Sequence, residues 1–224
     1  MTFRSLSQPR SRLADQVYEQ IMDAIRDGTI SAEDRIVQEK LAEQFQISRT
    51  PIREALFRME QEGILVVEGR GGFRIRTLDR AEIAELYGAR CAIEGFAARL
   101  LAERRDPALN DALRRTITAA EQIQARSVAA YFRANMTVHR AFVDATGNRF
   151  LLEFFDNLWN RGWAFTLFAT IESVDLSKSL GDHLALVDAI ATTDGSKAAE
   201  RMIAHINAGR ELQIEAGRQR GTIA

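Results

Sequence analysis

The stretch ISRTPIREAL, residues 47–56, decides the fold of the first part of this 224-residue chain. Two arginines and a threonine, Arg49, Thr50 and Arg53, surround a proline there. The missing N–H of proline costs little in the first turn of a helix, and Ser48 just before it is a favourable N-cap. The stretch therefore predicts a helix that begins after Ser48 and carries basic and hydroxyl side chains at its start.

The sequence around this helix predicts a winged helix-turn-helix, with three helices and a two-stranded wing, over residues 1–77. Apolar residues recur every four positions in LADQVYEQIMDAI, residues 13–25, which is typical of an amphipathic helix. QEKLAEQF, residues 38–45, predicts a short second helix, joined to the third by a short turn. ILVVEGRGGFRIRTL, residues 64–78, alternates around glycines and indicates two strands joined by a tight turn.

In a helix-turn-helix the second of the paired helices enters the DNA major groove with its first residues at the bases. Arg49 and Arg53 lie four positions apart, hence on one side of the helix, and a guanidinium can make two hydrogen bonds to the O6/N7 edge of guanine. Ser48 and Thr50 can reach phosphates beside the helix N-terminus. Contacts from the tip of the wing to the minor groove are expected from Arg70 and Gly71.

A solvated helix in a generic three-helix domain is the alternative, and these patterns alone do not decide between the two. The net charge of −1 gives no global basic signature, so a DNA-binding surface must come from local placement. The turn, the basic helix start and the glycine-rich wing occur in the order that DNA binding requires. This conjunction favours a DNA-binding domain.

The bulk composition favours a soluble, cytoplasmic protein. With 46% hydrophobic residues, the chain is long enough to form two domains with separate cores. Its single cysteine, Cys91, cannot form an internal disulfide and is expected to pack as a small core residue. The first residues lack the apolar core of a signal peptide, and the longest uncharged apolar run, residues 162–171, is too short to span a bilayer.

From Asp79 onward the sequence predicts an all-α bundle of six or seven helices, over residues 78–224. Six helical stretches follow one another without a strand pattern. Asp79 and Asp194 are expected N-caps. Helix breaks are expected near residues 106–107, 127, 147–148, 174–175 and 194–195.

The three histidines of the chain, His139, His183 and His205, fall on three different predicted helices. Each lies on an apolar stripe that faces the core; Asn135 shares the face of His139, and Leu212 belongs to the stripe of His205. Burying separate neutral imidazoles is costly unless each finds a partner, and one divalent cation would serve all three. The spacing leaves a shared metal and three separate hydrogen-bonded histidines as even alternatives.

Arg90 lies with Tyr87 and Glu94 on the inward face of the first helix of the bundle. It could pair with Glu94, four residues further on, as an ordinary ion pair. It could instead bind a carboxylate ligand in fork geometry, because an inward arginine needs a partner. The sequence alone leaves both interpretations open.

LAEQFQISRTPIREALFRMEQEGIL, followed by GRGGFRI, resembles the winged helix of the GntR family of bacterial transcriptional regulators. The resemblance covers about residues 11–77. It implies that Arg49, Thr50 and Arg53 contact DNA and that the turn at residues 69–72 assists. One position departs from the pattern, because Glu39 stands where some members carry an arginine near the start of the second helix.

LYGARCAIEGFAARLLAER, NMTVHRAFVDATGN, DHLALVDAI and MIAHI resemble the successive signatures of FCD, the helical effector domain of the FadR-type branch. Metal-binding members supply an Asp or Asn four residues before a histidine, and then two further histidines. Those positions here are Asn135, His139, His183 and His205. The resemblance implies a divalent metal ion, zinc or nickel, with open positions where a small organic acid binds and is held by Arg90.

The expected function is a homodimeric transcriptional repressor that reads a palindromic operator and responds to a small carboxylate effector. A second hypothesis is a metal sensor in which the cation itself is the signal. A third is a metal-dependent enzyme in which the histidines help to activate water. No inward Glu or Asp near the histidines stands out as a general base, and an enzyme leaves the first half unexplained, so no catalytic residues are expected.

Overall fold

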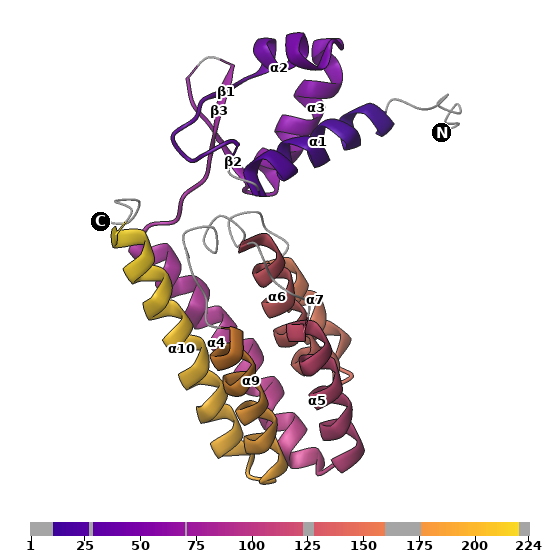
Figure 1. The fold of residues 1–224 in the computed structure, drawn as a ribbon, viewed down its shortest axis with the longest axis vertical. Helices are drawn as coiled ribbons and strands as arrows, with labels where there is room; N and C mark the ends of the chain where they lie inside the picture. The colour runs from indigo at the N-terminus through magenta and orange to yellow at the C-terminus, as the bar shows by residue number, and fades with distance from the viewer. Residues whose placement is uncertain (1–10, 27–28, 70, 123–127, 160–175, 220–224) are drawn as a thin grey trace, which may run out of the picture. The chain divides into compact units, whose positions relative to one another are not determined.

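The computed structural model describes residues 11–26, 29–69, 71–122, 128–159 and 176–219 (Figure 1). The chain divides into two compact units, Met1–Arg76 and Thr77–Ala224, each with buried apolar residues of its own. The boundary predicted from the sequence, between residues 77 and 78, lies one residue further along the chain. Within the described ranges, no helix is long and apolar enough to cross a membrane.

The first unit has three helices and three short strands among its described residues. They are α1 (Ser11–Arg26), β1 (Ile36–Val37), α2 (Gln38–Phe45), α3 (Arg49–Gln61), β2 (Leu65–Val67) and β3 (Gly72–Ile75). α1 packs against α3, and Ile21 of α1 and Ile52 and Leu56 of α3 are fully buried. Gln46, with a left-handed φ of 54°, caps the C-terminal end of α2, and α3 begins directly after Ser48. This short connection is the turn of a helix-turn-helix.

The wing is a three-stranded antiparallel sheet, which corrects the two strands predicted from the sequence. β2 and β3 pair as predicted, and β1 adds to the other edge of β3, with Ile36 opposite Phe73. β1 has only two residues, too few to show the alternation by which a strand is detected in a sequence. Gly69 and Gly71 have φ angles of 63° and 69°, which glycine adopts readily in a tight turn.

All six elements described in the second unit are helices, within the predicted six or seven. They are α4 (Arg80–Arg104), α5 (Pro107–Gln122), α6 (Val128–Asp144), α7 (Arg149–Trp159), α9 (Leu176–Ala191) and α10 (Gly195–Gln219). Both predicted caps are present: Asp79 forms a capping box with Glu82, and Asp194 accepts a hydrogen bond from the Lys197 N–H. The helix breaks predicted near residues 106–107, 147–148 and 194–195 are confirmed. Those predicted at residues 127 and 174–175 lie outside the described residues.

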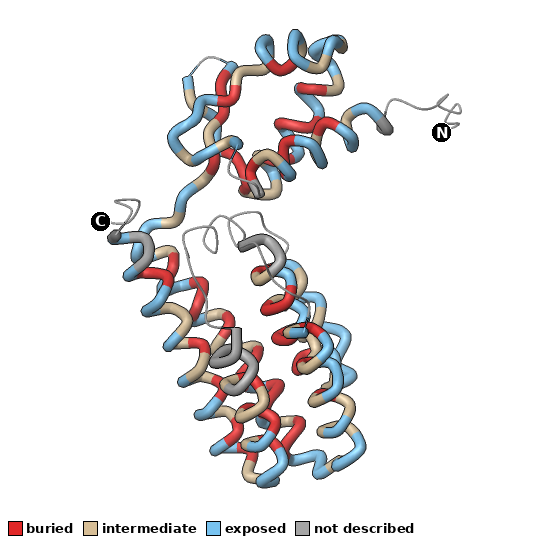
Figure 2. The backbone as a smooth tube through the Cα atoms, viewed as in Figure 1, coloured by how far each residue is buried: buried red, intermediate tan, exposed pale blue. Residues whose placement is uncertain are grey.

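α4 and α10 are 25 residues each and pack along one another, and α6 and α9 also contact α4. Buried residues lie on the facing sides of these helices (Figure 2). The inward faces of the four helices therefore share one core. Leu212 was predicted to lie on the same core-facing side of α10 as His205, but it is 67% exposed, so that prediction is wrong for Leu212.

Candidate metal centre and nucleic-acid interface

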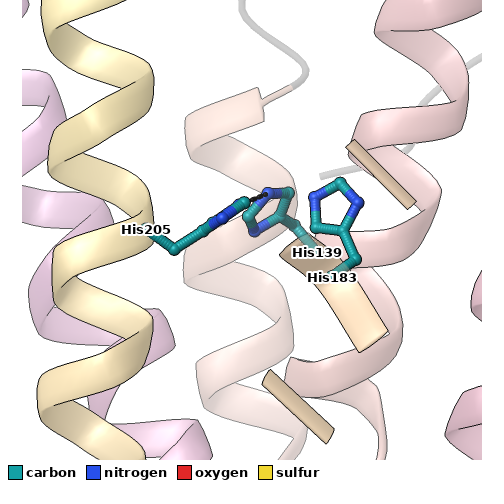
Figure 3. Close-up of side chains that lie close together, drawn as sticks. All are labelled: His139, His183 and His205. Atoms are coloured by element: carbon teal, nitrogen blue, oxygen red, sulfur yellow. Dashed lines mark hydrogen bonds between the residues drawn. The ribbon is translucent and has the colours of Figure 1, made fainter. Parts of the chain in front are cut away.

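The three histidines meet in the core of the second unit (Figure 3). His139 comes from α6, His183 from α9 and His205 from α10, and one ring nitrogen of each lies within 4.8 Å of the others. His139 and His183 are each only 1% exposed. This convergence fits the alternative of one shared site better than that of three separate histidines.

A buried carboxylate holds the ring of His139. Glu94 on α4 lies with its Oε2 2.5 Å from Nδ1 of His139, and its Oε1 accepts a hydrogen bond of 2.8 Å from Nε of Arg90. Burial alone would raise the pKa of Glu94, but Arg90 and His139 outweigh it and hold that pKa at about 2. Because Glu94 is therefore ionised, Nδ1 of His139 carries the hydrogen and Nε2 keeps its lone pair.

The ring of His183 is held in the same way. Its Nδ1 lies 2.6 Å from Oε1 of Glu121 on α5. Its Nε2 is buried and has no hydrogen-bond partner in the part of the chain that the structure describes. A buried polar atom without a partner is costly, whereas a metal-ligating histidine commonly donates its other N–H to a carboxylate. A metal ion bound at this nitrogen would satisfy it.

His205 completes the cluster. Its Nε2 lies 3.4 Å from Nε2 of His139. Burial lowers the pKa of His139 to about 4 and that of His205 to about 2, so both rings are neutral near pH 7. At this distance, two neutral ring nitrogens either share one proton in a hydrogen bond or both bind one cation instead of that proton. Nitrogens that each bind one zinc ion at about 2.0–2.1 Å stand roughly 3.0–3.4 Å apart, which this spacing matches.

Arg90 has a carboxylate partner inside the protein, so the structure shows the first of its two interpretations. Its guanidinium is paired with Glu94 and lies 4.5 Å from the ring centroid of Trp159 and 5.0 Å from that of Tyr87. Burial disfavours the charged guanidinium, but Glu94 outweighs burial and the pKa of Arg90 is raised. A guanidinium has five N–H groups, so one bond to Glu94 leaves others able to bind an anion.

The sequence placed Glu94 on the inward face beside Arg90, but it did not single out Glu121 as a partner of a histidine. Glu121 follows the buried residues Leu113 and Ile117 at four-residue spacing, so an acidic residue on an apolar stripe was the available signal. Asn135, the fourth predicted ligand, is 6% exposed on α6, four residues before His139.

The predicted DNA-contacting side chains of the first unit stand together at the start of α3. Ser48, Arg49, Thr50 and Arg53 are all exposed there. Ser48 occupies the predicted N-cap position, but its side chain makes no capping hydrogen bond. The unpaired N–H groups and the dipole at a helix start favour a phosphate at such a place.

Two contacts position the arginines of this surface. Nη1 of Arg49 lies 3.3 Å from Oε1 of Glu39 on α2, in an exposed ion pair. Arg53 lies over the ring of Phe57, 5.4 Å from its centroid, and Phe57 packs edge-on against Phe73 of β3. An exposed ion pair contributes about 0–1 kcal/mol, so Arg49 can exchange Glu39 for a DNA group at little cost.

The turn of the wing is only partly described. Gly71 is exposed, and Arg70, the predicted minor-groove contact beside it, lies outside the described residues. At the base of the turn a Cβ on Gly72 would come within 2.5 Å of Nε of Arg35 and 2.8 Å of the carbonyl oxygen of Glu68. The backbone approaches its neighbours so closely there that only glycine fits without rearrangement.

A winged helix-turn-helix with a basic recognition-helix start, followed by a helical bundle with a histidine cluster in its core, defines a DNA-binding regulator with a second, helical domain. Residues 13–75 match the gntR family of bacterial regulatory proteins, and residues 85–208 match the FCD domain. The chain belongs to the GntR family and carries an FCD domain. It is therefore a DNA-binding transcriptional regulator and not an enzyme, which removes the third hypothesis.

Similar proteins support this assignment over most of the chain. The HTH-type transcriptional regulator YdhC of Bacillus subtilis is 25% identical, over 86% of this chain and 87% of that protein. A probable D-xylose utilization operon transcriptional repressor of Paenarthrobacter nicotinovorans is 27% identical, over 89% of this chain and 88% of that protein. The solved structure of Escherichia coli McbR/YncC shares the fold, with a TM-score of 0.66 at 21% identity, and covers 94% of this chain and 99% of that one.

Proposed function

We propose that this chain is a cytoplasmic repressor whose operator affinity depends on a small carboxylate effector bound at a metal site in the second unit. The observation that carries the proposal is the meeting of three ring nitrogens within 4.8 Å, with Nε2 of His183 buried and lacking a partner among the described residues. Separate core histidines would each be expected to have their polar atoms satisfied.

The metal ligands in this proposal are Asn135, His139, His183 and His205. Imidazole ligands suit zinc and nickel, and we assign one of these two ions to the site. When bound, a divalent cation supplies an electrophilic centre that attracts a carboxylate oxygen. The hydrogen bonds to Glu94 and Glu121 occupy the Nδ1 atoms of two histidines, which leaves their Nε2 atoms for the cation.

Arg90 is the proposed second contact of the acid. One of its terminal nitrogens lies 3.4 Å from Nδ1 of His139, so its charge stands beside a proposed metal ligand. A charge-assisted, two-pronged contact is the strongest that a carboxylate can make with a single side chain. Arg90 would supply charge-assisted hydrogen bonds to the same acid that a bound cation would attract.

In the first unit, the proposed base contacts are those of Arg49 and Arg53, and the proposed phosphate contacts are those of Ser48 and Thr50. The wing adds minor-groove contacts from Arg70 and Gly71. One helix-turn-helix per chain implies a homodimer on a palindromic operator. Repression is proposed because the relative from Paenarthrobacter nicotinovorans is named a repressor.

The test measures operator affinity by fluorescence anisotropy, with an operator selected from a random duplex library. The protein is assayed stripped of metal, loaded with zinc or nickel, and loaded with metal plus acetate, malonate or citrate. An acid that changes affinity by about 5- to 150-fold, only in the metal-loaded protein, supports the proposal. A change of this size with metal alone, to which no acid adds, supports the metal-sensor hypothesis. Affinity that responds to neither metal nor acid contradicts both.

A further inference from the structure

The outward face of α3 carries a large apolar side chain among its polar ones. Phe57 is 42% exposed, whereas Ile52 and Met59 on the other side of the helix are fully buried. Phe57 comes seven residues after Thr50 and four residues after Arg53, so the three side chains share one face of the helix. An aromatic ring therefore stands within the surface that we propose to contact DNA.

The ring of Phe57 is held from two sides. It packs edge-on against Phe73 of β3, with 5.9 Å between the ring centroids and 86° between the ring planes, and Phe73 is buried. The guanidinium carbon of Arg53 lies over the ring of Phe57, 5.4 Å from its centroid. An isolated apolar residue on a surface needs no explanation. A ring fixed between the recognition helix and the wing, in contact with a DNA-facing arginine, is positioned for a contact of its own.

The chemistry of the major groove limits what this ring can recognise. The edges of the base pairs present hydrogen-bond donors and acceptors there, and the C5-methyl group of thymine is the apolar group among them. A phenylalanine ring has no hydrogen-bonding group, so it can select a base edge only by burying that methyl group. Phe57 is therefore suited to thymine.

The spacing along α3 places this thymine beside the base that Arg53 contacts. Four residues of an α-helix rise about 6 Å, and successive base pairs are about 3.4 Å apart. Arg53 and Phe57 are four residues apart and in contact with each other. Their two bases should lie within about two base pairs of one another.

We propose that Phe57 is a specificity-determining residue that contacts the methyl group of a thymine within about two base pairs of the guanine contacted by Arg53. Each half of the operator then contains this thymine. The inference rests on the proposed base contact of Arg53, and it does not depend on the metal or the effector.

The test removes single methyl groups from the DNA. Each thymine of an operator selected from a random duplex library is replaced in turn, in both half-sites, by deoxyuridine, which keeps the base pair and loses only the C5-methyl group. Fluorescence anisotropy of the full chain without added acid measures the affinity. At one thymine position, wild-type affinity should fall by about fourfold for each methyl group removed, as expected for exposing one buried apolar carbon.

Variants at Phe57 connect that methyl group to this side chain. Phe57→Ala should bind the unmodified operator more weakly, and deoxyuridine at the sensitive position should change its affinity by less than about 1.5-fold. Phe57→Gln should behave in the same way, which provides a second variant if the alanine variant is unstable. Phe57→Leu keeps an apolar side chain and should retain at least a twofold effect of the methyl group.

Leu13→Ala is the matched control, since Leu13 is an apolar residue of the same unit, 46% exposed, on α1 instead of the recognition helix. It should leave the operator affinity and the methyl effect unchanged. The inference is overturned if no thymine is sensitive to loss of its methyl group. It is equally overturned if Phe57→Ala and Phe57→Gln are as sensitive as the wild type.

Arg53→Ala, assayed on the same series of operators, separates this inference from the proposed base contact. If Arg53→Ala loses discrimination at its guanine but no methyl group matters to the wild type, the arginine contact is supported and the inference about Phe57 alone fails. If a methyl group matters only when Phe57 is present and Arg53→Ala keeps full discrimination, the role of Phe57 is supported and the base contact of Arg53 fails.

Discussion

Oε1 of Glu121 lies 2.6 Å from Nδ1 of His183, and the other nitrogen of that ring, Nε2, is buried with no partner in the described chain. Glu94 holds His139 by the same nitrogen at 2.5 Å. Two carboxylates, from α5 and α4, therefore engage two histidines through Nδ1. Their negative charges also offset part of the charge that a divalent cation would bring into the core.

Glu121→Gln should weaken zinc binding by about 10- to 100-fold, because the variant keeps the shape of the side chain but loses the charge that orients His183. Competition with a chromogenic chelator measures the affinity. Nitrogen-15 chemical shifts of the imidazoles should show His183 losing its fixed Nδ1–H form. Glu103→Gln is the control, because it makes the same change from carboxylate to carboxamide at an exposed residue of α4. It should leave both the zinc affinity and the imidazole chemical shifts unchanged. Wild-type affinity in Glu121→Gln would show that this carboxylate has no role in holding the metal.

Arg90→Ala should lower the free energy of unfolding of the metal-free protein by about 3–5 kcal/mol, because it leaves the buried carboxylate of Glu94 without its cation. Urea denaturation measures the loss. Adding Glu94→Gln should recover part of it by removing the unpaired charge. Arg99→Ala breaks an exposed pair with the same four-residue spacing and should cost less than about 0.5 kcal/mol. Equal losses for Arg90→Ala and Arg99→Ala would contradict the buried-pair account.

Arg49→Ala and Arg53→Ala should each reduce discrimination between operator variants, by about 1–3 kcal/mol at the base pair that the lost side chain reads. Anisotropy titrations against single-base operator variants provide the measurement. Arg58→Ala removes a charge from the same helix, where Arg58 pairs with Asp15 and Glu62, and should preserve discrimination. If the first two variants weaken all sequences alike, the arginines contact phosphates and the assignment to bases is wrong.

Glu39→Gln should strengthen DNA binding by up to about fivefold, because it removes both the competing partner of Arg49 and a negative charge near the phosphates. The comparison is with Glu43→Gln, which makes the same charge change on α2 at a residue that has no ion pair among the described residues. Weaker binding in Glu39→Gln alone would instead indicate that Glu39 contacts a base.

Most of the fold follows from the periodic spacing of apolar residues and from the capping residues at the helix ends. Apolar spacing locates the helices, and Asp79 and Asp194 cap the helices that they were expected to cap. β1 could not be predicted, because a two-residue strand is defined by its pairing with β3 and not by its own sequence. The partner of Arg90 was left open, and the pairing of Arg49 with Glu39 was not predicted, for a related reason: both depend on side-chain positions in space.

The histidine cluster was half predictable. Helical periodicity puts each of the three histidines on an inward face, but only the packing of α6, α9 and α10 shows that they meet. Glu121 was detectable in principle as an acidic residue on the stripe of Leu113 and Ile117. Its pairing with His183 joins residues 62 positions apart, and such a contact is not encoded in local spacing.

The most direct test of the central claim compares wild type with His183→Ala for zinc content, operator affinity and the effect of the carboxylate panel on that affinity. His183 supplies the orphaned nitrogen, so its loss should empty or weaken the metal site and abolish the acid response. Basal operator binding should stay within about threefold of wild type, because its contacts lie in the other unit. Full zinc content together with a normal acid response in His183→Ala would contradict the account and make the three histidines ordinary core residues.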